Sequence, residues 1–216
     1  MYRLCIFDLD GTLTDTLDSL EYSVNETMRE MNLKSITKEQ CRMFVGNGSK
    51  VLLERALEVS GDPDKLRIDE AMEVYDRVFK VNCTYKVVPY EGIRELLEEL
   101  KSRDIKLAVL SNKPDREVKS VVKKIFNEDT FDIARGQLEG TPRKPDPTAV
   151  HEIIDELQVD LSEVMYIGDS EVDIATGHAA KVKTVGVLWG FRSREVLMDA
   201  GAECMIDYPL ELIDLM

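Results

Sequence analysis

Two aspartates separated by one residue follow the first apolar run of the chain. The run Leu4-Cys5-Ile6-Phe7 leads into Asp8 and Asp10, and then into Gly11 and Thr12. Side chains two residues apart on an extended strand point to the same face, so the two carboxylates are expected to lie close together. Taken alone, Asp-x-Asp-Gly is also typical of a solvated strand end. Other polar groups must therefore decide whether the pair does chemistry.

Three more polar clusters occur further along the chain, two where a predicted strand ends and one just before a predicted helix. The carboxyl ends of parallel strands meet at one edge of a sheet, which is where ligands bind in open α/β folds. A solvated loop explains any one cluster, but it explains the set poorly. The candidate residues are Ser111 and Asn112 in "VLSNKP", Lys144 in "RKPDP", and Asp169 and Asp173 in "YIGDSEVD".

These residue types together suit phosphoryl transfer. Carboxylates at a strand edge can hold a hard divalent cation, and Mg2+ prefers oxygen ligands. Such an ion would cancel the repulsion between Asp8, Asp10 and Asp169. One carboxylate can attack phosphorus to form an aspartyl-phosphate, while a second protonates the leaving alcohol and later activates water. Lys144 and the hydroxyl of Ser111 would hold the remaining phosphoryl oxygens.

Alternating strands and helices must position these groups. Apolar residues recur at i, i+3, i+4 and i+7 in 91–103 and in 146–157, which predicts two amphipathic helices. Alternation of strands and helices predicts an α/β fold with a doubly wound parallel sheet covered on both faces. The predicted strands are Tyr2–Phe7, Ile105–Leu110, Phe131–Ala134, Val164–Ile167, Thr184–Leu188 and Cys204–Ile206.

One stretch breaks this alternation. Residues 15–84 show helical patterns and no convincing strand, so they are predicted to form a small all-helical domain inserted after the first strand. Residues 1–14 and 85–216 then form the catalytic core, with Pro89 and Gly92 in the returning linker. The insert leaves and rejoins the core beside the two aspartates. We therefore expect it to be a mobile cover for the site.

The four motifs "FDLDGT", "LSN", "KP" and "GDSEVD", in this order and with a helical insert after the first, resemble the haloacid dehalogenase superfamily of phosphatases. The resemblance spans nearly the whole chain. It implies a helical cap formed by the insert. It also implies these roles: Asp8 as nucleophile; Asp10 as general acid and base; Mg2+ bound by the Asp8 carboxylate, the Asp10 carbonyl and the Asp169 carboxylate, with Asp173 in support; and Ser111, Asn112 and Lys144 on the phosphoryl group.

Two stretches narrow the resemblance within the superfamily. "FVGNGSKVLLERAL" in the insert resembles the cap loop of phosphoglycolate phosphatases, and 185–207 resembles their C-terminal portion. Turn glycines leave backbone N–H groups available to an anion, although Gly-x-Gly before a helix is also a common turn. Whether Arg55 reaches the substrate is left open by the sequence. The substrate-binding candidates are Gly11 and Thr12 in the core and Gly46, Asn47, Gly48 and Lys50 in the insert.

The chain departs from the family's pattern at Lys181. After "IATGHAA" the family often has glycine at this position, which is predicted to be the end of a helix. A lysine there can interact favourably with the last carbonyl groups. The change therefore puts the cap of this helix in doubt, not the catalysis.

Composition restricts the partners. A net charge of −14 and a pI near 4.7 disfavour nucleic acid, whose binding requires many phosphate-neutralising cations. No apolar run reaches the length of a membrane span, and the first apolar run is too short for a signal peptide, so we expect a cytoplasmic protein without membrane partners. Its four cysteines show no CxxC spacing, which favours reduced thiols. Either a monomer or a homodimer fits the sequence.

The sequence thus predicts a Mg2+-dependent hydrolase of a small phosphorylated metabolite, with 2-phosphoglycolate as the leading substrate. Alternatives on the same fold are a phosphosugar mutase similar to β-phosphoglucomutase, a pyrophosphatase or a nucleotidase. Dehalogenation is disfavoured by Asp10, because that chemistry needs no leaving-group acid. A phosphoryl-accepting receiver domain is the non-enzyme alternative, but such domains are shorter and lack a helical insert after the first strand.

Overall fold

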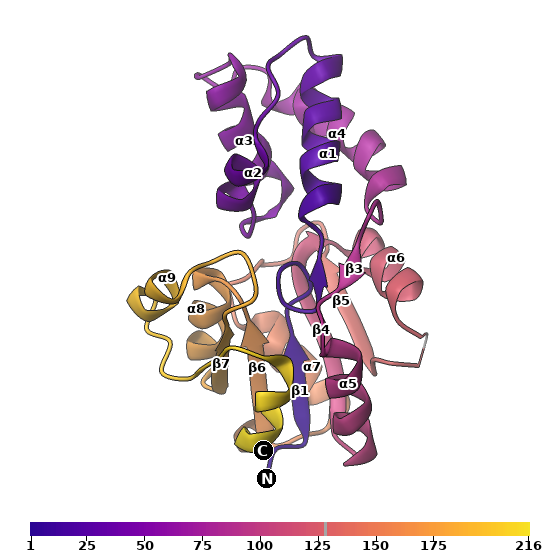
Figure 1. Ribbon diagram of the computed structural model, residues 1–216, viewed down its shortest axis with the longest axis vertical. Coiled ribbons are helices and arrows are strands. Elements are labelled where there is room, and N and C mark those ends of the chain that lie inside the picture. The colour runs from indigo at the N-terminus through magenta and orange to yellow at the C-terminus, as the bar shows by residue number, and fades with distance from the viewer. Residues whose placement is uncertain (128) are drawn as a thin grey trace. The chain divides into compact units, whose positions relative to one another are not determined.

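A six-stranded parallel sheet organises the first of two units in the computed structural model, which describes residues 1–127 and 129–216. This unit comprises Met1–Asp15 and Pro89–Met216, and its strands follow the order β5-β4-β1-β6-β7-β8 (Figure 1). The neighbouring strands of this sheet pair in parallel, which confirms the predicted doubly wound α/β core. The strands are β1 (Leu4–Phe7), β4 (Lys106–Pro114), β5 (Ile133–Gln137), β6 (Val164–Gly168), β7 (Lys183–Val187) and β8 (Met205–Ile206).

The central strands are apolar on both faces because helices cover both. On one face, alternate residues of β1, β4 and β6 pack against the apolar stripe of α7 (Thr148–Leu157). Figure 1 shows α7 behind the sheet and α5 (Ile93–Ser102) in front of it. Other helical elements of this unit are α6 (Asp115–Ile125), η1 (Leu161–Glu163), α8 (Glu171–Ala180), α9 (Arg194–Asp199) and η2 (Pro209–Leu215).

Strand β4 is longer than the sequence predicted. The apolar run ends at Leu110, but the extended backbone continues through Pro114, so Ser111 and Asn112 lie within the strand rather than after it. Its ladder with β5 shifts register after the pair of Leu110 with Arg135 and resumes where Pro114 opposes Gln137. Hydrophobic periodicity gives no signal for such a polar continuation, because it depends on hydrogen bonds to a neighbouring strand.

The second unit, Thr16–Val88, is helical. The sequence predicted the insert at 15–84, and its function as a cap stays a prediction. A capping box at Thr37 and Gln40 fixes the start of the second helix. The chain forms the short strands β2 (Thr14–Asp15) and β3 (Val88–Pro89) where it passes between the two units. The helices are α1 (Leu17–Glu30), α2 (Lys38–Phe44), α3 (Gly48–Ser60) and α4 (Ile68–Asn82).

Along the part of the chain that the structure describes, none of the helices combines the length and the apolar character that crossing a membrane requires.

Candidate active site

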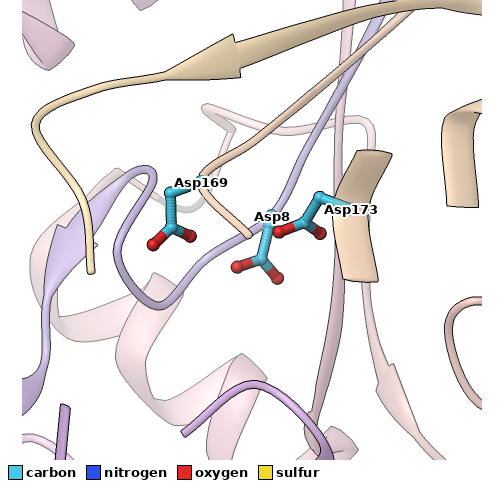
Figure 2. Close-up of side chains that lie close together, drawn as sticks. All are labelled: Asp8, Asp169 and Asp173. Carbon is cyan, nitrogen blue, oxygen red and sulfur yellow. The ribbon is translucent and has the colours of Figure 1, made fainter. Parts of the chain in front are cut away.

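Three carboxylates from two neighbouring strand exits converge in the first unit. Asp8 directly follows β1, Asp169 directly follows β6, and Asp173 lies in the first turn of α8. Figure 2 shows the three side chains close together, and one oxygen of each lies within 4.8 Å of the others. All three are buried. Parallel pairing of β1 with β6 produces this arrangement, because it brings their carboxyl ends side by side.

Lys144 connects two of these carboxylates. Its Nζ donates to Asp8 Oδ1 at 2.7 Å, to Asp173 Oδ1 at 2.8 Å and to the carbonyl of Leu110 at 3.1 Å. The backbone of Lys144 is held by Asn112, whose side chain accepts from the Lys144 N–H at 3.0 Å and donates to its carbonyl at 3.1 Å. Asn112 thus fixes the loop that carries Lys144, and its expected contact with the phosphoryl group stays a prediction.

Asp169 is held by neutral donors. Oδ1 accepts from the hydroxyl of Thr12 at 3.2 Å, and Oδ2 accepts from the N–H of Phe191 at 2.7 Å. Two glycines make room for this carboxylate. A Cβ on Gly11, whose φ is +93°, would come within 2.4 Å of the Asp169 carboxylate, and one on Gly190 would come within 2.3 Å of its Cβ. Gly11 and Thr12 thus both lie against Asp169, and their role in binding substrate stays a prediction.

Asp173 has polar contacts on both of its oxygens. Oδ2 accepts from the N–H and the hydroxyl of Ser170, which completes a capping box at the start of α8. Oδ1 accepts from Lys144 and, at 3.2 Å, from the hydroxyl of Tyr166. This saturation suits the supporting role that the resemblance implied, in which Asp173 orients the groups that touch an ion.

Asp10 has a lysine partner that sequence reasoning missed. The Nζ of Lys113 lies 2.5 Å from Asp10 Oδ1, and the two side chains are 2% and 12% exposed. Ser111 supports this lysine, because its hydroxyl accepts from the Lys113 N–H at 3.2 Å. In "VLSNKP", only Ser111 and Asn112 were singled out as candidates, and Lys113 was given no role. A signal was nevertheless present, since it stands two residues after Ser111 in the same motif.

Burial shifts the protonation equilibria of this cluster. Desolvation raises the pKa of Asp8 from its ordinary value of 3.8 to about 7, although Lys144 opposes the shift. Burial, reinforced by Asp173 and Asp8, also raises the pKa of Asp169 well above its usual range. For Lys144, burial alone would lower the pKa, but the carboxylates of Asp173 and Asp8 outweigh it and raise the pKa well above its ordinary value. The ammonium group of Lys144 therefore does not fully stabilise the ionised carboxylates of the cluster.

The donor set fits a hard divalent cation. Asp8 and Asp169 offer carboxylate oxygens in a buried cluster, and the raised pKa of each shows that its ionised form lacks full compensation. A bound Mg2+ would supply that compensation, since it prefers oxygen ligands. The side chain of Asp10 instead pairs with Lys113, which is consistent with the expectation that Asp10 would use only its main-chain carbonyl.

The candidates in the helical unit lie together in one turn. Gly46 has a φ of +119° and Gly48 one of +82°, with Asn47 between them at the N-cap of α3. Lys50 is exposed on the first turn of that helix. Arg55 donates from Nη1 to the carbonyl of Phe44 at 2.9 Å, so one of its nitrogens joins α3 to the end of α2. A role for this turn in binding substrate stays a prediction.

Comparison with known proteins gives the family. The model of the haloacid dehalogenase-like hydrolases matches residues 5–187. The chain belongs to the haloacid dehalogenase-like hydrolase family. The phosphoglycolate phosphatase of Aquifex aeolicus is 32% identical over 189 residues, which are 88% of this chain and 86% of the relative. That of Colwellia psychrerythraea is 30% identical over 216 residues, which are 98% and 95% of the two chains.

Solved structures of this hydrolase family agree. The crystal structure of a predicted phosphatase from Clostridium acetobutylicum superposes with a TM-score of 0.86 at 26% identity, covering 100% of this chain and 98% of the other. A predicted phosphoglycolate phosphatase from Haemophilus somnus shows the same fold, with a TM-score of 0.91 at 23% identity and coverage of 99% and 97%. The expected enzyme class, a phosphoric monoester hydrolase of this superfamily, is confirmed.

Proposed function

We propose that this hydrolase is a Mg2+-dependent phosphatase that cleaves a small phosphomonoester through an aspartyl-phosphate on Asp8, with 2-phosphoglycolate as its substrate. The observation that carries the proposal is the buried Asp8 carboxylate, held by Lys144 beside Asp169 and Asp173. Two phosphoglycolate phosphatases, 30% and 32% identical over 98% and 88% of this chain, support the choice of substrate.

Each residue of the cluster has a task in this reaction. An Asp8 oxygen attacks phosphorus, so that a P–O bond to Asp8 forms while the ester P–O bond breaks. The departing alkoxide takes a proton from the carboxyl group of Asp10. Asp10 then takes a proton from water, whose oxygen attacks phosphorus and breaks the bond to Asp8, releasing phosphate. Lys144 and Ser111 hold phosphoryl oxygens, where charge resides during the transfer.

Asp8, the carbonyl of Asp10 and Asp169 would hold the Mg2+ ion, which when bound neutralises phosphoryl charge and the repulsion among the carboxylates. The orientation of the Asp169 carboxylate is already set by the protein, because Thr12 and Phe191 each donate a hydrogen bond to one of its oxygens. Lys144 keeps Asp8 in place with one ammonium contact while the backbone of its loop is tied to Asn112.

The test is release of phosphate from a panel of esters with Mg2+. The panel contains 2-phosphoglycolate, a sugar phosphate, pyrophosphate, a nucleoside monophosphate and p-nitrophenyl phosphate. Wild type should be fastest on 2-phosphoglycolate, and Asp8→Asn should lose at least about 10³-fold in turnover, as expected for loss of a nucleophile. Asp199→Asn is the matched control, since Asp199 is an exposed carboxylate at the end of α9.

Two outcomes would contradict the proposal at different levels. Full turnover by Asp8→Asn, or by wild type in excess chelator, would refute the mechanism. A faster reaction with the sugar phosphate, pyrophosphate or the nucleoside monophosphate would refute only the choice of 2-phosphoglycolate, since p-nitrophenyl phosphate reports the intrinsic reactivity of an activated ester. Rapid quenching during turnover of a phosphate-labelled ester should also trap label on wild type but not on Asp8→Asn.

A further inference from the structure

The two aspartates of "FDLDGT" are held by two different lysines. Lys144 contacts Asp8 at 2.7 Å, whereas Lys113 contacts Asp10 at 2.5 Å. Neighbouring parallel strands produce the second pair, since Phe7 of β1 opposes Val109 of β4 and each partner lies a few residues beyond that point. In the reaction proposed above, one lysine thus contacts the nucleophile and another contacts the acid and base.

The backbone of Lys113 is fixed on two sides. Its N–H donates to the hydroxyl of Ser111, two residues earlier. Its carbonyl lies against Gly136 of β5, where a Cβ would come within 2.6 Å of that oxygen. Pro114 follows directly and restricts its own φ. Because the backbone of Lys113 is held in place, its ammonium group restricts the position of the Asp10 carboxylate that it contacts.

The exposure of the pair differs between its members. The Lys113 side chain is 2% exposed, whereas that of Asp10 is 12% exposed. The carboxylate is thus the more accessible member of the pair. A buried ion pair is also weak evidence for stabilisation, because well-packed apolar residues often serve as well. The geometry of the pair thus favours a role in orienting Asp10.

We propose that Lys113 is a positioning residue: its ammonium holds Oδ1 of the Asp10 carboxyl group, so that the other oxygen, which carries the proton, faces the leaving alcohol. This inference rests on the proposed function. A proton donor must lie within hydrogen-bond reach of the leaving oxygen, so a carboxylate free to rotate loses much of its effect. Lys113 does not act on substrate, and its influence should appear only where the reaction needs the proton.

The leaving group provides the readout. An alkyl alkoxide departs slowly unless protonated, whereas p-nitrophenolate departs readily without an acid. The quantity compared is kcat/KM, which reports steps through departure of this first product and is unaffected by later hydrolysis of the aspartyl-phosphate. The alkyl probe is the alkyl ester of the panel that wild type cleaves fastest, and the aryl probe is p-nitrophenyl phosphate.

Lys113→Met keeps the length of the stem and removes the ammonium. We expect its kcat/KM to fall about 30-fold or more on the alkyl ester, within the 10²–10⁴-fold that a general acid supplies, and less than about 3-fold on the aryl ester. The Mg2+ concentration for half-maximal activity should stay within about 2-fold, since the Asp8 and Asp169 carboxylates remain. Lys113→Arg should recover most of the loss on the alkyl ester because it retains a cationic donor.

Two controls separate positioning from general damage. Lys119→Met removes another lysine paired with an aspartate, Asp115 on α6 at 2.7 Å, and should leave both esters unaffected. In an Asp10→Asn background, Lys113→Met should lower kcat/KM on the alkyl ester by less than about 2-fold, because residues that act through one another are not additive.

The outcomes are distinct. Wild type without Mg2+-dependent activity on any ester would refute the proposed function and this inference together. An active wild type with equal losses on both esters in Lys113→Met, or an undiminished loss in the Asp10→Asn background, would refute this inference alone. Should Lys113→Met not fold, Lys113→Gln is measured in the same way; failure of both variants to fold would make the pair structural and overturn the inference.

Discussion

At the scale of single residues, the two carboxylates expected to contact a metal are held by different kinds of donor. Asp8 meets the ammonium of Lys144, whereas Asp169 meets a hydroxyl and a backbone N–H. Neither arrangement offsets the cost of burial, since the pKa of each carboxyl is raised. Without an ion, the ionised site therefore opposes folding. Such a cost is common at functional sites, where the arrangement required for chemistry differs from the most stable one.

This cost predicts a pH-dependent stability in the presence of chelator. Because the pKa of Asp8 rises from 3.8 to about 7 on folding, the folded chain retains a proton that the unfolded chain loses between these values. The contribution of Asp8 thus favours folding below about pH 4 and is lost as the pH rises through about 7. Relative to Asp8→Asn, wild type should lose up to about 1.4 kcal/mol of unfolding free energy per pH unit in this window.

Urea unfolding in chelator at intervals from pH 5 to pH 8 measures this difference. Asp199→Asn should show no such trend relative to wild type, since Asp199 is exposed. A difference between wild type and Asp8→Asn that does not change with pH would show that Asp8 titrates as an ordinary carboxyl.

At the scale of elements, strand exits and helix ends position the chemistry. The start of α8 is fixed by the Ser170 and Asp173 capping box, which also places Asp173 beside Lys144. The other end of α8 has a lysine, Lys181, at a position that glycine usually occupies. Lys181 adopts a left-handed conformation with φ of +59°, and Val182 donates to the carbonyl of Gly177 as in a Schellman motif. This position was predicted as a helix terminus, and the structure confirms it.

Lys181→Gly should stabilise the protein. A left-handed conformation costs a residue with a Cβ roughly 1–2 kcal/mol, while the greater freedom of glycine in the unfolded chain returns part of this gain. A net gain of about 0.5–1 kcal/mol corresponds to a Tm increase of about 1–4 °C for a chain of this size. Lys181→Ala is the control, because it removes the charge but keeps the Cβ, and it should not raise the Tm. An equal increase in both variants would attribute the effect to charge.

Particular elements show how far the sequence predicts such a site. The apolar runs before Asp8 and Asp169 identify β1 and β6, and parallel pairing then requires their exits to meet. Lys113 was missed because the polar continuation of β4 has no hydrophobic periodicity and depends on its ladder with β5. The hydrogen bonds from Asn112 to the Lys144 loop could not be predicted either. They depend on the Asn112 rotamer and join residues 32 positions apart, which motif spacing does not encode.

At the scale of the whole molecule, the net charge is negative, whereas the candidate site contains buried positive groups. The chain carries a net charge of −14, which attracts cations and repels anions at long range. Lys144 and Lys113 place two buried ammonium groups within the candidate site, where screening by salt is weakest. We therefore expect the net charge of the molecule to favour approach of Mg2+, while Lys144 and a bound Mg2+ ion would retain an anionic substrate.

Mg2+ should accordingly stabilise the protein in a salt-dependent way. Binding to the folded state alone contributes about 2.7 kcal/mol at 100 times the Kd, which raises the Tm by roughly 5–10 °C for a chain of this size. Raising tetramethylammonium chloride from 0.02 to 0.5 M should weaken the apparent affinity several-fold, because it screens the field of the −14 charge without offering a competing ion for the carboxylates. Thermal unfolding over a Mg2+ titration measures both quantities.

Asp169→Asn provides the control for this titration. Asparagine can still accept from the N–H of Phe191, so the fold should persist, but one expected ligand charge is lost. The Tm increase with Mg2+ should then fall to less than about 2 °C, since the remaining site binds the ion far more weakly. An unchanged increase in Asp169→Asn would place the stabilising ion elsewhere on the acidic surface. A wild-type affinity independent of salt would show that the cluster around Asp8, and not the net charge, determines how strongly the ion is attracted.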